Sequence, residues 1–255
     1  MRITLLQRPG LASQEDFCTN LGSALSDLRS GLSASTAIVG FSKRGWARVE
    51  VEGDDQEVVQ ELISRELGQA RTDISSIEKH GNYQGIVVGE FGGNLEVDLG
   101  VETPQPMNVK IKVSTLRAQL ADGKTVSGRE VVEHYCLFPS SRVGIRVTRL
   151  ESEAGIIEGW FSDSQLQLFS EWITTRLDRI QVYHCFRQQI ESAVHRAKLE
   201  RDIIATEPMT LTTHSAVCKL GTDAIGLIPR LGSMLRKSEL KPFLPERILA
   251  RCRQW

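Results

Sequence analysis

The spacing of apolar residues in the first third of the chain predicts strands that alternate with helices. Residues 2–7 are strand-like, and the helix that follows Ser13 has one apolar face formed by Phe17, Leu21, Leu25, Leu28 and Leu32. Two β-rich runs, 37–41 and 47–51, are joined by a turn, and a second helix follows residue 55. Residues 1–72 are therefore predicted to form an N-terminal α/β sandwich.

In the middle third, apolar residues recur every two residues instead of every 3.6, and a period of two is typical of half-buried strands. Strands are predicted at 85–90, 95–101, 109–113, 143–147 and 154–161, with a helical segment at 114–138. Because side chains alternate between the two faces of a strand, the fourth strand is predicted to direct Val143, Ile145 and Val147 into a core and Arg142 and Arg146 toward solvent. Residues 80–162, with five short strands and one inserted helical segment, resemble an OB-fold barrel of the kind found in ribosomal and exosome subunits.

Residues 163–255 are predicted to form a third unit that begins with helices. One helix starts at Ser162, and a second has Val182, Phe186, Ile190 and Val194 on one face. A hairpin of strands 201–206 and 211–220 follows, and a last helix begins after Asp223. The chain is therefore predicted to be an α+β protein of three small parts: an α/β sandwich, an OB-like β-barrel and a helix-hairpin-helix α/β domain.

The turn Gly221-Thr222-Asp223 connects the last predicted strand to the last helix. The free backbone N–H groups and the positive dipole end at such a junction suit an anion. Asp223 is also a good N-cap residue, and a cap would occupy one of these donors with a negatively charged group. Capping is the favoured interpretation, and anion binding is the alternative.

The stretch 216–232, together with 243–248, resembles the C-terminal signature of an archaeal family still classed as a domain of unknown function, number 2110. This resemblance implies an archaeal, cytoplasmic protein with the same three-part layout, and it implies no activity. The C-terminal part also weakly resembles KH-type RNA modules, through its order of helix, hairpin, glycine turn and helix.

Charge is distributed unevenly although the whole chain is nearly neutral. It has 31 Lys and Arg against 32 Asp and Glu, a net charge of -1, with 40% hydrophobic residues in the range of ordinary soluble proteins. Residues 1–172 hold 17 basic and 24 acidic side chains, a net of -7, whereas residues 173–255 hold 14 and 8, a net of +6. The C-terminal third is therefore a candidate anion-binding region, with a solvated charged surface as the alternative.

Several classes of function find no support in the sequence. The five cysteines are spread out and never form a Cys-x-x-Cys pair, so we expect no disulfide framework and no structural metal. We also expect no cofactor. Glu130, Glu133 and His134 are an incomplete version of an inverted zinc-peptidase motif, and no phosphate-binding loop or nucleophile elbow occurs. No targeting or membrane-spanning run is found. We therefore expect a cytoplasmic protein that is not an enzyme.

The function predicted from this layout is binding of nucleic acid, RNA in particular, in archaeal information processing, with ribosomes or RNA-processing complexes as candidate settings. OB-folds bind single strands with basic grooves and exposed aromatic residues. The candidate contacts are Tyr83, Phe91, Lys110, Lys112, Arg142, Arg146, Arg187, Arg196, Lys198, Arg201, Arg230, Arg236 and Lys237. The alternative is an adaptor without direct nucleic-acid contact, whose acidic N-terminal part and basic C-terminal part bind different protein subunits of a larger complex. An enzyme of unrecognised type is a third interpretation.

Overall fold

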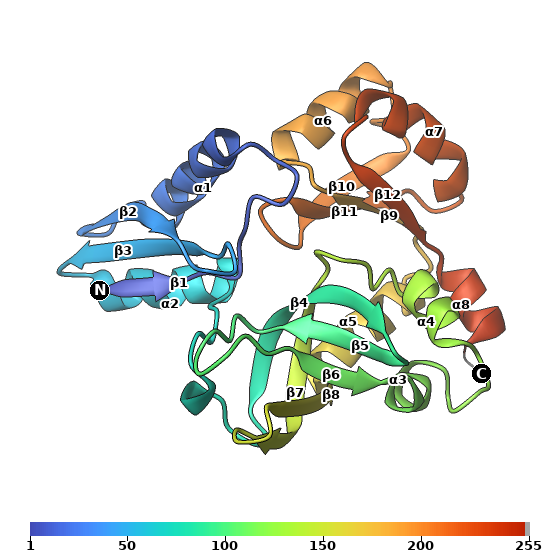
Figure 1. Cartoon of the computed structure of the whole chain (residues 1–255). Helices are drawn as coiled ribbons and strands as arrows, with labels where there is room; N and C mark the ends of the chain where they lie inside the picture. Colours follow the sequence, from blue (N-terminus) through green and yellow to red (C-terminus); the bar gives the residue numbers. More distant parts are fainter. Residues whose placement is uncertain (253–255) are drawn as a thin grey trace.

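The computed structural model describes residues 1–252 and contains three separate sheets with helices around them (Figure 1). This arrangement confirms the predicted α+β fold class. The N-terminal unit has an antiparallel sheet in the order β1-β3-β2, and its core joins the inward side of β3 to the apolar sides of two helices. Its elements are β1 (Arg2–Thr4), α1 (Gln14–Leu28), β2 (Ala34–Phe41), β3 (Ala47–Gly53) and α2 (Gln56–Leu67).

The middle of the chain forms a closed barrel of five strands in the order β4-β5-β6-β8-β7. All neighbours are antiparallel except β6 and β8, which are parallel. The predicted helical segment is two short helices, because the chain turns at Gly123 and a capping box at Ser127 starts the second one. The elements are η1 (Ile74–Ser76), β4 (Asn82–Phe91), β5 (Asn94–Asp98), β6 (Val109–Lys112), α3 (Val113–Leu120), α4 (Gly128–His134), β7 (Arg142–Glu151) and β8 (Ile156–Phe161).

The last third of the chain forms a four-stranded antiparallel sheet in the order β10-β11-β9-β12. The sequence β9-α6-β10-β11-α7-β12 is the split β-α-β arrangement, with the apolar sides of α6 and α7 in one core cluster with the sheet. The elements are α5 (Asp163–Thr174), β9 (Arg179–Tyr183), α6 (Arg187–Arg196), β10 (Ile203–Pro208), β11 (Thr213–Cys218), α7 (Ala224–Met234), β12 (Glu239–Phe243) and α8 (Pro245–Arg251).

The prediction of a long helix through Val182 is wrong, because that residue lies in strand β9. A spacing of four residues is compatible with both a helix face and a strand face, so it does not distinguish them. All five residues of β9 are buried, which leaves the strand without a polar side that would have revealed it. The chain then turns at His184, whose φ is 60°, and α6 begins at Arg187.

On strand β7 the alternation prediction is right for the apolar side chains, whereas Arg142 and Arg146, predicted to face solvent, are both half-buried. Val143, Ile145 and Val147 are buried in the barrel, as predicted. The Arg142 guanidinium is half-buried, and it donates hydrogen bonds to the backbone carbonyl oxygens of Arg65, at 3.1 Å, and Glu66, at 2.8 Å. The C-terminal end of α2 packs over this part of the barrel and partly buries the Arg142 side chain.

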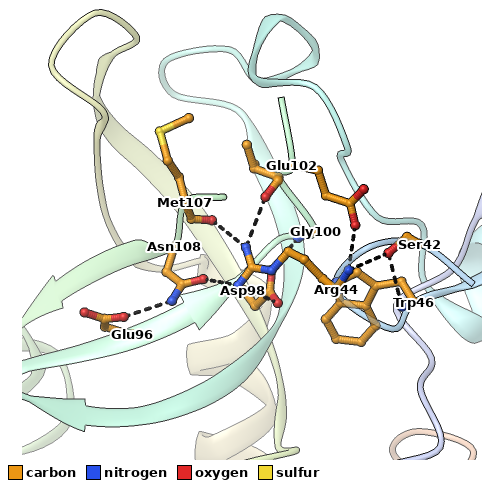
Figure 2. Close-up of polar contacts among 10 residues, drawn as sticks. Ser42, Arg44, Trp46, Glu96, Asp98, Gly100, Glu102, Met107 and Asn108 are labelled. Atoms are coloured by element: carbon orange, nitrogen blue, oxygen red, sulfur yellow. Dashed lines mark hydrogen bonds and ion pairs between the residues drawn. The ribbon is translucent and has the colours of Figure 1, made fainter. Parts of the chain in front are cut away.

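A buried polar network joins the N-terminal sheet to the barrel (Figure 2). Arg44, in the turn between β2 and β3, lies 2.9 Å from the Asp98 carboxylate at the end of β5, and Asp98 is only 1% exposed. The same guanidinium donates to the carbonyl oxygens of Val101 and Met107 and to Oδ1 of Asn108, at distances of 3.1, 3.0 and 2.6 Å. The network therefore fixes the β2–β3 turn against the barrel.

The C-terminal unit is joined to both other parts of the chain. The side chain of Phe186 belongs to the core of the N-terminal unit. The Tyr183 hydroxyl donates to the Cys136 carbonyl oxygen at 2.9 Å, on the barrel side. Helices α5 and α8 follow residue 162 in the sequence, but their apolar residues pack into the barrel core. The domain boundaries 1–72, 80–162 and 163–255 stay predictions.

Candidate nucleic-acid interface

The outer wall of the barrel carries the two lysines of strand β6. Lys110 and Lys112 are exposed, because Val109 and Ile111 alternate with them and fill the core. In the register with β5, Lys110 pairs with Glu96 and Lys112 pairs with Asn94. These paired side chains point to the same face of the barrel, which is the outside.

Two exposed aromatic side chains flank these lysines. Phe91 is 54% exposed and pairs with Asn94, so it lies in the same cross-strand row as Lys112. Trp160 is 42% exposed on β8, the strand on the other side of β6, and pairs with Arg146 of β7. Within residues 1–252, Phe91 and Trp160 are the only exposed aromatic side chains. The barrel wall thus combines cations with two flat apolar surfaces.

Carboxylates on the same wall limit its positive charge. The Glu158 carboxylate lies 3.2 Å from the Lys112 ammonium and 3.8 Å from the Arg149 guanidinium. Glu96 accepts a hydrogen bond of 2.9 Å from the Asn108 amide. Arg146 is half-buried beside Trp160, and its Nε atom is buried with no hydrogen-bond partner in the described chain. Lys110 and Arg146 are therefore the wall cations that no described carboxylate neutralises in an ion pair.

Two other candidates from the sequence are held by contacts within the protein. The Tyr83 hydroxyl accepts a hydrogen bond of 2.7 Å from the backbone N–H of Glu78, and the Arg71 guanidinium lies 5.4 Å from the centre of the Tyr83 ring. Arg142 is committed to carbonyl oxygens, and burial lowers the pKa of its guanidinium. Neither side chain is presented on the wall as Phe91 and Trp160 are.

The seven basic candidates of the C-terminal unit separate into two groups. Arg196, Arg236 and Lys237 line one cleft, which lies between the start of α1 and the surface formed by α6 and the segment after α7. The others lie outside this cleft, and two of them have partners. Arg187 forms an ion pair of 2.7 Å with Glu191, and Arg230 donates to the Ala197 carbonyl oxygen. Lys198 and Arg201 are exposed near the end of α6.

The glycine turn before α7 is a helix cap. The Asp223 carboxylate accepts hydrogen bonds from the backbone N–H groups of Ile225 and Gly226, at 3.0 and 3.2 Å. The N–H of Ala224 donates to Asp178 at 3.2 Å. Carboxylates thus occupy the donors that an anion would need, in agreement with the favoured interpretation.

The incomplete peptidase motif on α4 is also explained by capping. The Glu130 carboxylate accepts from the backbone N–H of Ser127 at 2.8 Å, and this contact with the Ser127 N–H lowers its pKa. A cluster of three or more His, Cys, Asp or Glu side chains able to hold a metal ion does not occur in residues 1–252. Among the helices described, none is long and apolar enough to cross a membrane.

Sequence reasoning missed Trp160 and Arg149 on the wall. The signal for Trp160 was present, because Ile157, Gly159 and Phe161 alternate with Glu158 and Trp160 on a predicted strand. This alternation alone places the Trp160 indole on the outer face of the barrel, on the same side of the strand as Glu158. The register that brings it next to Arg146 could not be predicted, because the two strands are joined by a loop and carry a bulge.

The fold is that of an α+β protein in which a closed barrel follows one smaller sheet and precedes another along the chain. Residues 177–241, which include β9 to α7, match the family model of the DUF2110 C-terminal domain, and this match confirms the resemblance to that family. None of the curated proteins matches the chain. Among solved structures, a chain in the crystal structure of the a/eIF2alpha-aDim2p-rRNA complex from Pyrococcus horikoshii OT3 is similar over 50% of this chain and 70% of its own, with 12% identity and a TM-score of 0.27. A likeness at this TM-score supports no argument about fold or function.

Proposed function

We propose that the protein binds single-stranded RNA on the outer wall of its barrel, without a catalytic step or a cofactor. The observation that carries this proposal is the placement of Phe91 and Trp160 on one wall, on either side of the lysines of β6. Stacking of a base on an aromatic side chain contributes about 1 to 3 kcal/mol, and cations beside it hold the phosphates. A role in cytoplasmic archaeal information processing is proposed from the family resemblance.

The spacing across the wall suits a strand that crosses β5, β6 and β8. Phe91 and Trp160 are separated by three strand spacings, which is a path of about 14 Å around the curved wall of the barrel at about 4.8 Å per spacing. The exposed Lys110 and Lys112 lie between them on β6. Two bases can therefore stack at the ends of a segment whose phosphates pass over the lysines.

Truncation of Trp160 gives the first test of this proposal. We expect Trp160→Ala to weaken binding of a labelled single-stranded RNA about 5- to 150-fold in fluorescence anisotropy, because one stacked base loses its partner. Trp160→Phe retains a flat ring and is expected to stay within about threefold of the parent. Val39→Ala, an exposed apolar truncation on β2, is the matched control. Affinity within twofold of the parent for Trp160→Ala would rule out stacking at this position.

The adaptor alternative is favoured by one observation, on strand β2. This strand lies at the edge of its sheet, and Ala34–Phe41 contains no charged residue, although exposed edges are commonly protected by charge. Val39 on this strand is 43% exposed. A protein partner could add a strand here. Binding of such a partner should depend less steeply on salt than binding of RNA, whose phosphates release counterions.

A further inference from the structure

A cleft of about 550 Å³ lies between the N-terminal and C-terminal units. One wall is the segment before and at the start of α1, and the other is formed by α6 and the residues that join α7 to β12 (Figure 1). Phe186 forms part of the cleft and packs into the core of the N-terminal unit, so the two walls are held together at this point. The volume lies within the range of small-molecule sites in proteins, about 300 to 1,000 Å³.

The charges around the cleft are mainly positive and are not neutralised. Arg196, Arg236 and Lys237 line it, and within the described chain none of the three has an ion-pair partner. The Arg196 Nε atom donates only to the Ser192 carbonyl oxygen, at 3.4 Å. The acidic residue in the lining, Asp16, accepts a hydrogen bond from the Ser13 hydroxyl at the start of α1. Guanidinium groups bind phosphate in a bidentate manner, so this set of charges suits a phosphate.

The remainder of the lining is apolar or uncharged. Leu11 is 70% exposed and Met234 is 40% exposed, and both belong to the cleft. The Nδ1 atom of His184 is buried and has no hydrogen-bond partner among the residues described. Exposed apolar side chains beside unpaired cations suit a ligand that has both a flat apolar part and an anionic part.

We infer that this cleft binds a nucleotide-like ligand, with the phosphate on Arg196, Arg236 and Lys237 and the base against Leu11 and Met234. The ligand is either a free mononucleotide or the phosphorylated end of an RNA strand, since both present the same groups. The inference does not depend on the barrel wall, because the two surfaces share no residue.

The test is isothermal titration of the full chain with adenosine 5′-monophosphate. We expect Arg236→Gln/Lys237→Gln to weaken binding at least about tenfold, because each hydrogen bond to a charged group contributes more than about 1.4 kcal/mol. Lys198→Gln/Arg201→Gln is the control: it makes the same change of charge in the same unit but outside the cleft, and we expect less than about twofold. Hydrogen exchange at residues 11–16 is expected to slow when the ligand binds, because this segment forms one wall.

RNA oligonucleotides with a 5′-phosphate or a 5′-hydroxyl end identify the source of the ligand. These are titrated into the Trp160→Ala variant so that the barrel wall contributes little. Tighter binding of the phosphorylated strand would assign the cleft to an RNA end, and equal binding of the two strands together with binding of the mononucleotide would assign it to a free nucleotide. Binding of the mononucleotide and of the phosphorylated strand both weaker than about 1 mM, or equal effects of the two double variants, would overturn the inference.

Discussion

Replacement of Arg44 by methionine is expected to lower the free energy of unfolding by about 3 to 5 kcal/mol at pH 7. The substitution leaves the Asp98 carboxylate, which is 1% exposed, without the guanidinium 2.9 Å away. It also removes the donors to the carbonyl oxygens of Val101 and Met107. Arg8 remains near Asp98 and offsets only part of the loss. Urea unfolding followed by circular dichroism measures this difference.

The pH dependence of the Arg44→Met defect identifies its cause. Burial already raises the pKa of Asp98 in the native protein, Arg44 and Arg8 lower it, and nearby Glu102 raises it. Without Arg44 this pKa rises further, so the folded variant binds a proton more tightly than the unfolded chain does. A group with a raised folded pKa stabilises the fold at low pH and loses that contribution as pH rises. The defect is therefore expected to shrink from pH 7 to pH 5, and a defect that is constant with pH would contradict this account.

Acidification is expected to destabilise the protein through His214. This side chain is buried on β11, and its pKa is lowered from 6.5 to about 4, mainly by burial and secondly by Arg187, against the smaller raising effects of the Cys185 backbone and of Glu191. The unfolded chain binds the proton more tightly, so the stability contributed by the neutral imidazole is complete above about pH 6.5. It is lost as pH falls toward 4. At about 1.4 kcal/mol per unit of pKa, the loss approaches 3 kcal/mol.

The variant His214→Gln separates this effect from the titration of carboxylates. Glutamine does not titrate in this range, so the free energy of unfolding of the variant should fall less than that of the parent between pH 7 and pH 4. His184, whose pKa is also lowered by burial, is present in both proteins and cancels in the comparison. Parallel pH profiles for the parent and the variant would show that His214 is not the group responsible.

Elements with one clear period could be predicted from the sequence. Helix α1 has an apolar face and a cap at Ser13 that accepts from the backbone N–H of Asp16, and strand β7 alternates strictly at its start, so both were placed within a few residues. Strand β9 could not be predicted, because it is buried on both faces and its residues fit a helical spacing. β12 and α8 were missed as well, and their apolar residues Phe243 and Ile248 pack into the barrel core.

The candidate sites depended even more on long-range contacts. That Lys110 and Lys112 point outward follows from their alternation with Val109 and Ile111. The position of Trp160 beside Arg146 depends on the register between β7 and β8. The cleft is lined by residues more than 170 positions apart in the sequence, such as Leu11 and His184. The basic C-terminal residues appeared equivalent in the sequence, whereas the structure separates those that line the cleft from those that lie elsewhere.

The most direct test of RNA binding at the wall is a variant that should strengthen it. Glu158 neutralises Lys112, so Glu158→Gln frees this cation without changing the barrel core, whereas Arg149 keeps its ion pair of 2.7 Å with Glu151. In anisotropy titrations of single-stranded RNA at several salt concentrations, we expect tighter binding than the parent. The plot of log affinity against log salt should be steeper by roughly 0.7 if the freed Lys112 binds one additional phosphate. Unchanged affinity and slope for Glu158→Gln, or no RNA binding by the parent near physiological salt, would contradict the account.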